Sequence, residues 1–377
     1  MGLRGTTAIV GVGETRPDRF SGKTGEPSIS MPQYLSTATR LALADAGLGP
    51  RDFDGQGFGA VISTNHPQPF WPEEAAEILG ISPGLLLAGG QAGAAAVSLL
   101  GQAAAAIESG LVELVLVVAA SAPLSEHGLD SQTYETRDFE APFGVMGANS
   151  KIAMVMRRHM HEYGTKPEHL GRLAVAARRQ AGLNPIAYLR EPIAIEDYLS
   201  SRLIADPLRL LDCVLPANGG KAYVVASAKR AQELGQRAIY IRGFGERSNP
   251  SYGDRMASDM LVTGIAEAGR TALDMAGITR TELDFLQLYD NYLIIVQMQL
   301  EDLGFCAKGD TRFLERTDFS STGDLPIQTG GGMINYGQPN TTGGLLHVIE
   351  AVHQLRSNAG ARQVPRAQKS VSTRKQS

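Results

Sequence analysis

Cysteine is scarce in this sequence, with only two among 377 residues. Two cysteines cannot build a disulfide framework in so long a chain, so the cytoplasm is the expected compartment. Long apolar runs are also lacking. None reaches the roughly 18 residues of a membrane-spanning helix, and the first residues lack the apolar core of a signal peptide. Neither sign of charge dominates, since the formal net charge is −4. The chain therefore has no overall basic field for nucleic acid or a membrane, and an anionic ligand must be held locally.

Apolar residues make up 43% of the sequence and charged residues 20%. That balance predicts a globular protein with a large core, organised as two domain-sized halves. The two cysteines, Cys213 and Cys306, lie in apolar contexts, and we interpret both as structural residues.

One pattern occurs twice along the chain. Each copy has a strand ending Gly-x-Gly-Glu, a helical stretch ending Ala-Gly, and an aspartate before the next strand. The first copy has these features at residues 8–14, 42–48 and 51–54, and the second at residues 238–246, 272–278 and 281–284. A glycine directly after a helix is typical of a left-handed C-cap. The Gly-x-Gly of residues 11–13 does not continue into a full Gly-x-Gly-x-x-Gly, so dinucleotide binding is not indicated.

Each copy continues with a glycine-rich stretch that opens an apolar helix. Residues 89–93 precede a helix predicted over 94–110, and residues 330–344 precede one that runs to Leu355. Their small residues predict central helices that face one another. Leu111 to Ser121 is a nearly continuous apolar run, as expected of a strand buried on both faces. Strands alternating with helices predict a duplicated α/β fold.

Residues 122 to about 212 interrupt the first copy and are too many for an ordinary connection, which is typical of a functional loop domain. His159 and His161 stand in this insertion two residues apart. Such a pair does not share one helix face, so we interpret both as helix-surface residues and not as metal ligands.

The densest glycine segment runs from Gln328 to Gly344, with the sequence Gln-Thr-Gly-Gly-Gly-Met-Ile-Asn-Tyr-Gly-Gln-Pro-Asn-Thr-Thr-Gly-Gly. Glycine lets a backbone pass close to a ligand and presents bare N–H groups to it ahead of a helix. The segment is therefore predicted to be a site.

This segment resembles the C-terminal active-site loop of the thiolase superfamily, Asn-x-x-Gly-Gly-x-x-x-x-Gly-His-Pro. Gln328 stands at its asparagine and Gln338 at its catalytic histidine. Residues 89–96 resemble the stretch that carries the thiolase nucleophilic cysteine, with Gly90 in its place, and residues 289–292 fill the positions of Asn-Glu-Ala-Phe. Residues 157–164, 205–213 and 288–309 resemble the lipid-transfer, sterol-carrier branch of that superfamily.

The resemblance implies a duplicated five-layer α-β-α-β-α fold. Residues 1–235 would form the N-terminal half with the inserted loop domain, and residues 236–365 the C-terminal half. Resembling sequences continue with two further strands, so we expect this chain to be truncated at its C-terminus and to lack a central hairpin. The tail 366–377 is polar and basic and is predicted to be disordered.

The altered positions decide which chemistry to expect. Glycine cannot form an acyl-enzyme, and glutamine donates hydrogen bonds but does not exchange a proton near neutral pH. Standard thiolase acyl transfer is therefore not expected. The branch includes steroid side-chain aldolases, which work with a small zinc-ribbon and OB-fold partner. The resemblance thus implies retro-aldol cleavage of a β-hydroxyacyl-CoA, with no permanently bound cofactor, no metal, and a homodimeric assembly.

Candidate residues come from the matched motifs. The catalytic candidates are Tyr336, Asp290 and Tyr252, and the substrate-binding candidates are Gly90, Gln91, Tyr289, Tyr292, Gly331, Gly332 and Gln338. Alternatives stay open: Tyr336 could pack against a partner subunit, and Asp290 could cap a neighbouring loop. The chain could also be a non-catalytic acyl-CoA or lipid-binding homologue, or an acyltransferase subunit of atypical mechanism, so whether it is an enzyme is open as well.

Overall fold

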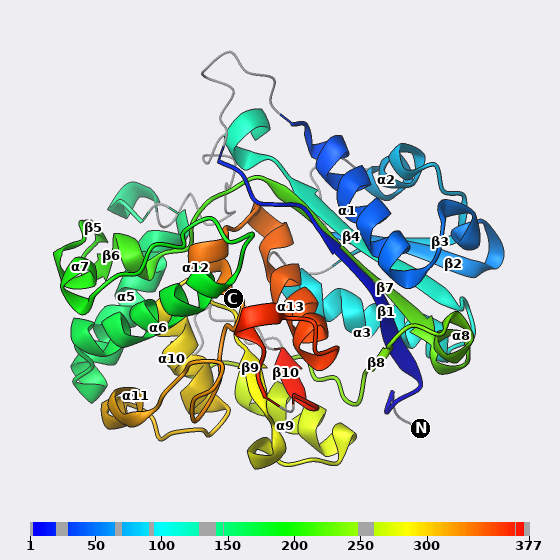
Figure 1. Ribbon diagram of the computed structural model, residues 1–377. Helices are drawn as coiled ribbons and strands as arrows, with labels where there is room; N and C mark the ends of the chain where they lie inside the picture. Colours follow the sequence, from blue (N-terminus) through cyan, green and yellow to red (C-terminus); the bar gives the residue numbers. More distant parts are fainter. Residues whose placement is uncertain are drawn as a thin grey trace.

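A computed structural model describes residues 3–19, 29–64, 70–89, 94–127, 141–145, 147–247, 260–365 and 367–372. Its largest element is a six-stranded sheet with strand order β3-β2-β4-β7-β1-β8 (Figure 1). The strands are β1 (Thr7–Glu14), β2 (Gly55–Thr64), β3 (Pro83–Gly89), β4 (Leu114–Ser121), β7 (Gly219–Ser227) and β8 (Ile239–Tyr240). Strand β2 is parallel to β3 and β4, whereas β7 is antiparallel to both β4 and β1. The predicted apolar strand 111–121 is thus confirmed as β4.

Helices cover both faces of this sheet. One face carries α1 (Met31–Ala46), α2 (Trp71–Leu79) and α8 (Ala228–Leu234), and the other carries α3 (Ala95–Glu108) and α13 (Leu345–Leu355). Strand β4 alternates between the two cores, with Leu116 facing α1 and Val117 facing α3. Both side chains are fully buried. The two predicted central helices are confirmed as α3 and α13, which contact each other.

The second half has a much smaller sheet. Strand β9 (Phe285–Gln287) pairs in parallel with β10 (Ser370–Ser372). Both contact α13, so α3 and α13 lie between the two sheets, and α9 (Ile265–Ala276) lies beyond the second sheet (Figure 1). Helix, sheet, helices, sheet and helix succeed one another in five layers. The prediction of a duplicated α/β fold is confirmed.

The inserted residues form helices beside the second half. They are α5 (Gly147–Tyr163), α6 (Pro167–Leu183) and α7 (Ile195–Ser200), with a small hairpin of β5 (Leu203–Ala205) and β6 (Leu208–Arg209). Helix α6 contacts α10 (Leu293–Asp302), α11 (Thr311–Arg316) and α12 (Gly332–Tyr336). The insertion and the second half therefore share one apolar core.

The predicted helix ends are confirmed in both copies. Helix α1 ends at Gly47 and α9 ends at Gly277, and both glycines are left-handed, with φ of 70° and 68°. Among the described residues, no helix is long and apolar enough to cross a membrane.

Two expectations are wrong. His159 is not on the helix surface but fully buried, with Nδ1 2.8 Å from Thr165 Oγ1 and Nε2 3.1 Å from Glu301. A buried imidazole needs polar partners, and here Thr165, six residues away, and Glu301, 142 residues away, supply them. The tail is not disordered throughout, because residues 370–372 form β10. The Asp284 carboxylate accepts 2.8 Å bonds from the backbone N–H of Gln368 and Lys369, which fixes the entry to that strand despite its polar side chains.

Candidate active site

The glycine-rich segment folds as a short helix, α12, followed by a 3-10 turn (Asn340–Gly344) that leads into α13. Gly332, at the first position of α12, has φ of 67°. A Cβ atom on Gly332 would lie 1.9 Å from Asp290 Oδ2, so only glycine fits there. The segment therefore passes close to Asp290, one of the four residues 289–292 that resemble the thiolase Asn-Glu-Ala-Phe motif.

Asp290 is 1% exposed and faces the start of α12. Its Oδ1 accepts a 2.9 Å bond from the N–H of Met333, and Oδ2 accepts a 3.3 Å bond from the N–H of Ile334. These are bonds to orphan N–H groups at a helix start. Of the two roles considered for Asp290, the capping role is the one these contacts support.

The side chains of Tyr289 and Gln338 are hydrogen-bonded to each other. Gln338 Nε2 donates a 3.1 Å bond to the Tyr289 hydroxyl, and the Gln338 N–H donates to the carbonyl of Leu215 at 2.7 Å. The Gln299 side chain fixes the backbone of Tyr289. Its Nε2 donates to the Tyr289 carbonyl at 2.7 Å, and its Oε1 accepts from the Tyr289 N–H at 3.2 Å. An amide and a phenol thus stand together where an ordinary thiolase has its histidine.

Tyr336 is fully buried at the end of α12. Its hydroxyl donates to Glu14 Oε2 at 2.8 Å and lies 3.1 Å from the carbonyl of Thr15. Lys221 Nζ lies 2.9 Å from the same Glu14 oxygen and 4.2 Å from the centre of the Tyr336 ring. Burial, with the neighbouring carboxylate of Glu14, raises the pKa of Tyr336 well above its ordinary value. The phenol is therefore held in its neutral form.

The Glu14 and Lys221 charges compensate each other in the interior. Burial alone would raise the pKa of Glu14, but the Lys221 ammonium, together with His353 and the Tyr336 hydroxyl, brings that pKa below its usual value. Burial lowers the pKa of Lys221, and Glu14 partly opposes that shift. Tyr336 is thus anchored to a buried ion pair between strands β1 and β7.

The other predicted residues divide into two groups. Gly331 and Gly332 lie at the start of α12, where Gly332 faces Asp290 and Gly331 faces Ala181 of α6. Tyr292 is separate from them, because its hydroxyl donates to Asn149 Oδ1 in α5 at 2.6 Å. Three predicted positions lie outside the described residues: Gly90, Gln91 and Tyr252.

Sequence reasoning missed three buried ionisable residues at this site, namely Glu14, Lys221 and His347. His347 Nε2 is 3.2 Å from Asp290 Oδ1 but lacks hydrogen-bonding geometry, and its Nδ1 is 3.5 Å from Gln287 Oε1. A signal was present, since Lys221 and His347 each interrupt an otherwise apolar run. Charged residues are rarely buried unless paired, so such interruptions point to buried partners.

Relatives matched over nearly the whole chain decide the family. The sequence is 33% identical over 372 residues to a steroid side-chain-cleaving aldolase from Thermomonospora curvata. The aligned region covers 93% of this chain and 91% of that relative. The chain belongs to the thiolase-like family. It is also 32% identical to a 17-hydroxy-3-oxo-4-pregnene-20-carboxyl-CoA lyase from Mycobacterium tuberculosis, with 95% of this chain and 93% of that protein covered. Residues 247–375 of this thiolase-like chain match the family model described as thiolase C-terminal domain-like.

Solved structures agree with that membership. A structure described as the Ltp2-ChsH2(DUF35) aldolase superposes with a TM-score of 0.86 at 30% identity, covering 98% of this thiolase-like chain and 95% of the other. A monomeric SCP2-thiolase-like protein from Mycobacterium smegmatis has a TM-score of 0.69 at 20% identity over 93% of this chain and 72% of the other, and that likeness concerns the fold alone. The predicted branch of the family is therefore confirmed.

Proposed function

We propose that this protein catalyses the retro-aldol cleavage of a β-hydroxyacyl-CoA in the breakdown of a lipid or steroid side chain. The observation that carries the proposal is the near end-to-end match to relatives named as a steroid side-chain-cleaving aldolase and a carboxyl-CoA lyase. It agrees with the sequence itself, where Gly90 stands at the position of the thiolase nucleophile.

The proposed step needs no covalent intermediate. A base accepts the proton of the β-hydroxyl, the Cα–Cβ bond breaks, and its electron pair moves into the thioester enolate. The β-carbon leaves as a ketone or aldehyde, and the enolate takes up a proton at Cα to give a shorter acyl-CoA. Preorganised hydrogen-bond donors near the thioester oxygen stabilise the enolate.

Residues of the glycine-rich segment and of the other matched motifs supply groups for that step. We assign the donors to the Gln338 amide and the Tyr289 phenol, which are already paired at 3.1 Å. Tyr336 and Tyr252 remain the proton-transfer candidates. Asp290 acts as a positioning residue, because its carboxylate holds the first N–H groups of α12. Gly90, Gln91, Gly331, Gly332 and Tyr292 remain proposed contacts of the substrate.

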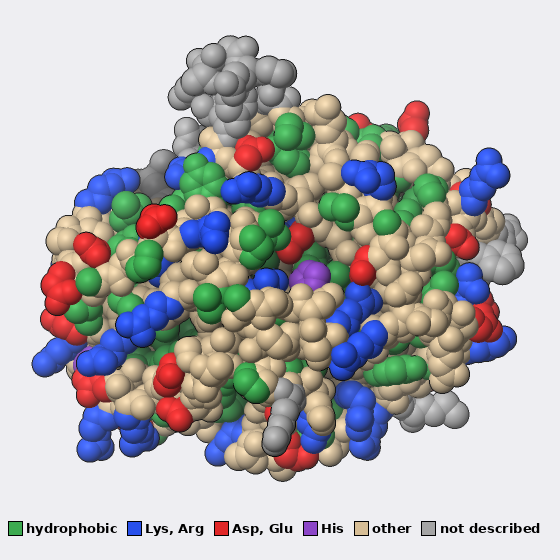
Figure 2. All heavy atoms as spheres, viewed as in Figure 1, with side chains coloured by type: hydrophobic (Ala, Val, Ile, Leu, Met, Phe, Trp, Pro, Cys, Tyr) green, Lys and Arg blue, Asp and Glu red, His purple; other side chains and the backbone are tan. Residues whose placement is uncertain are grey.

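Coenzyme A must be recognised through local contacts. Lys and Arg side chains are interspersed with Asp and Glu over the face seen in Figure 2, so this face presents no field of one sign. We also propose a cytoplasmic homodimer and a small partner protein. Support for the partner comes from the solved relative, whose description pairs the aldolase with a DUF35 protein.

The decisive assay follows cleavage of a branched or steroid-like β-hydroxyacyl-CoA by mass spectrometry, with and without a DUF35 partner. A shorter acyl-CoA and a carbonyl product should appear. Tyr336→Phe should lower kcat by about 10² to 10⁴ if its hydroxyl transfers a proton. Tyr240→Phe is the control, because Tyr240 is 41% exposed in β8, where it pairs with Ala8 of β1. An acetyl adduct in the intact mass after incubation with acetyl-CoA would instead support an atypical acyltransferase.

A second candidate function is acyl-CoA binding without turnover. It is favoured by the closed environment of Tyr336, which is 0% exposed with its hydroxyl on Glu14. The same assay separates the two. Saturable acyl-CoA binding by the partner-bound protein, with no cleavage of any tested β-hydroxyacyl-CoA, would replace the aldolase proposal with the binding one.

A further inference from the structure

The carboxylates of Asp290, Glu350 and Glu14 all accept hydrogen bonds from the glycine-rich segment. A carboxylate that acts as a base needs an oxygen that can accept a proton from the substrate. Both Asp290 oxygens accept bonds from the first N–H groups of α12. Both Glu350 oxygens accept bonds from the Arg362 guanidinium, at 3.1 and 3.0 Å. These two carboxylates are therefore occupied on both oxygens.

Glu14 differs from them, because both of its hydrogen bonds end on the same oxygen. Its Oε2 accepts the Tyr336 hydroxyl at 2.8 Å and the Lys221 ammonium at 2.9 Å. Its Oε1 has no hydrogen-bond partner among the described residues, and it is not a fully buried atom. The carboxylate is thus fixed through one oxygen, and the lone pairs of the other oxygen remain available.

Access to this group is through Glu14. Its side chain is 11% exposed, whereas the Lys221 side chain is 1% exposed and Tyr336 is 0% exposed. A fully buried hydroxyl that already donates to a carboxylate cannot meet a substrate in this arrangement. The accessible proton acceptor of the three side chains is therefore the Glu14 carboxylate.

The end of β1, where Glu14 stands, packs against the turn that carries Gln338. A Cβ on Gly337 would lie 3.2 Å from the Cβ of Pro17, three residues after Glu14. Gln338 follows directly and is hydrogen-bonded to Tyr289. Glu14 and the two donors assigned to the enolate thus belong to one packed region.

The groups around Glu14 keep it in the form that accepts a proton. Burial would raise its pKa, but Lys221 of β7, His353 of α13 and the Tyr336 hydroxyl of α12 bring the pKa below its usual value. Glu14 is therefore ionised near neutral pH, as a base must be before the step begins.

We propose that Glu14 is the base of the retro-aldol step and that Tyr336 and Lys221 are positioning residues that hold its Oε2. This assignment rests on the proposed function. Oε1 accepts the proton of the β-hydroxyl, the Cα–Cβ bond breaks, and its electron pair forms the thioester enolate while the β-oxygen becomes a carbonyl oxygen. Glu14 then gives the proton to Cα, which restores the carboxylate. The Tyr336 hydroxyl keeps its own proton throughout.

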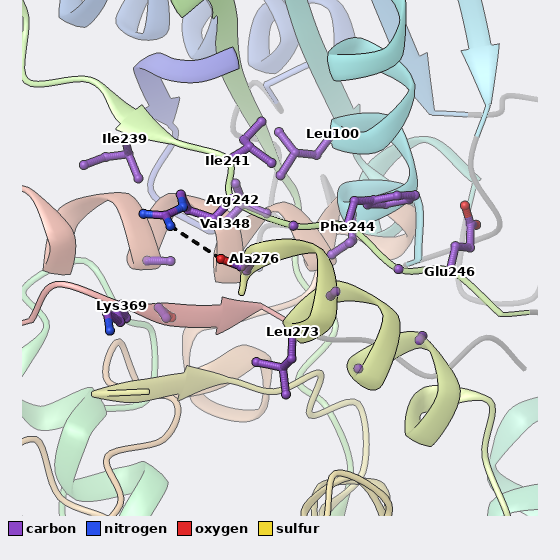
Figure 3. A pocket seen from close by; sticks show the side chains of 18 of the residues that line it. Leu100, Ile239, Ile241, Arg242, Phe244, Glu246, Leu273, Ala276, Val348 and Lys369 are labelled. Atoms are coloured by element: carbon purple, nitrogen blue, oxygen red, sulfur yellow. Dashed lines mark hydrogen bonds between the residues drawn. The ribbon is translucent and has the colours of Figure 1, made fainter. Parts of the chain in front are cut away.

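The second copy of the Gly-x-Gly-Glu motif supplies a matched control. Its glutamate, Glu246, lines a cavity of about 270 Å³ between α9 and α13, together with apolar side chains such as Phe244 and Leu273 (Figure 3). Glu246 Oε1 accepts a 2.6 Å bond from Ser98. None of the described residues that line this cavity belongs to the segment 328–344, so Glu246→Gln should retain the parent kcat.

Substitution of Glu14 tests the assignment in the cleavage assay with the DUF35 partner present. Glu14→Gln still accepts the Tyr336 hydrogen bond but cannot take up a proton near neutral pH, so kcat should fall by about 10² to 10⁴. Tyr336→Phe keeps the base and loses one bond to Oε2, so kcat should fall only about tenfold. Unchanged kcat in Glu14→Gln, or an equal loss in Tyr336→Phe, overturns the assignment.

Folding of the variants is checked by circular dichroism and Tm, because Glu14→Gln leaves the Lys221 ammonium buried without its anion. Where the single variant fails to fold, Glu14→Gln combined with Lys221→Met carries the test, since no buried charge is then left alone. The combined variant also lacks the base, so its kcat should be as low as that expected of Glu14→Gln. Parent-like cleavage by the combined variant overturns the assignment.

The pH profile gives a readout that a structural role of Tyr336 would not move. The acid limb of kcat/KM should report the ionisation of Glu14. The Tyr336 hydroxyl lowers the pKa of Glu14, so Tyr336→Phe should move that limb to higher pH, while Glu246→Gln leaves it in place. An unmoved limb in Tyr336→Phe contradicts the assignment.

The outcomes separate this inference from the proposed function. A partner-bound parent protein that cleaves no β-hydroxyacyl-CoA overturns both. A parent protein that cleaves its substrate, beside a folded Glu14→Gln variant that cleaves it equally fast, overturns the base assignment and leaves the proposed function standing.

Discussion

In both halves the first strand packs against a helix in the same way. The halves differ in how the edges of that strand are paired. A Cβ on Gly13 would lie 2.3 Å from the Ala38 carbonyl of α1, and a Cβ on Gly245 would lie 1.9 Å from the Ala268 carbonyl of α9. Strand β1 is paired with β7 along one edge and with β8 at Ala8 and Ile9 on the other, whereas residues 242–245 have no backbone partner among the described residues. The close contact between the first strand and its helix is thus found in both halves. Pairing of the glycine-containing part of that strand with a neighbouring strand is found only in the first half, among the described residues.

The glutamates that directly follow these glycines, Glu14 and Glu246, have different surroundings because the strands are paired differently. Glu14 meets Lys221 of β7 and the Tyr336 hydroxyl in the interior. Glu246 occupies the equivalent place in the second half, where no strand corresponds to β7 among the described residues. It is exposed and accepts a 2.6 Å bond from Ser98 Oγ. The same motif therefore gives a buried ion pair in one half and a surface contact in the other.

Removing the Lys221 ammonium should strongly lower the free energy of unfolding. Lys221→Met leaves the Glu14 carboxylate buried without its cation, and the loss of one partner of a buried pair costs about 3 to 5 kcal/mol. Urea unfolding measures the change in the free energy of unfolding. Lys221→Met combined with Glu14→Gln should recover much of the loss, because no buried charge is then left alone. A loss below about 1 kcal/mol for the single variant would mean that solvent reaches Glu14.

Matched glycine substitutions compare the two strand–helix contacts. Gly13→Ala should cost about 1 to 3 kcal/mol or more, because Gly13 is held in the sheet by its pairing with Ala222 of β7 and cannot easily move away from α1. Gly245→Ala should cost less, although its Cβ would approach the helix more closely, because the unpaired segment can shift. Thermal unfolding of the two variants tests the order. Equal losses would show that residues 242–245 are held as firmly as β1.

Acid should weaken the first half through Glu14. A carboxylate whose folded pKa lies below its unfolded value stabilises the fold above that unfolded value, here about 4.5, and the contribution is lost as the pH falls through the folded pKa. The stability difference between wild type and Glu14→Gln should therefore be largest near pH 6 and shrink toward pH 3. Glu246→Gln is the control at the equivalent exposed position. A difference that stays constant with pH would contradict the assigned charge on Glu14.

Local patterns in the sequence predicted much of this fold. The glycine C-caps, the apolar strand β4 and the helices α3 and α13 depend on neighbouring residues, and all were predictable. The partners of Asp290 and Tyr336 were not, because Met333 and Glu14 reach them from distant parts of the chain. The burial of His159 was missed for the same reason. Its partner Glu301 is 142 residues away and becomes a neighbour only when the insertion packs on α10.

The smallest effect is expected at Glu246. This residue takes the place of Glu14 in the second half, but it accepts a hydrogen bond from Ser98 where Glu14 forms a buried ion pair with Lys221. Ser98→Ala removes the hydroxyl that donates to Glu246 Oε1 at 2.6 Å. Glu246 is exposed, so water can take the place of the hydroxyl, and the loss should stay near the lower end of the roughly 0.5 to 1.5 kcal/mol typical of a hydrogen bond. Urea unfolding beside Lys221→Met gives the comparison under one set of conditions. If Ser98→Ala destabilises as strongly as Lys221→Met, then Glu246 is shielded from water, and the two halves enclose their glutamates alike.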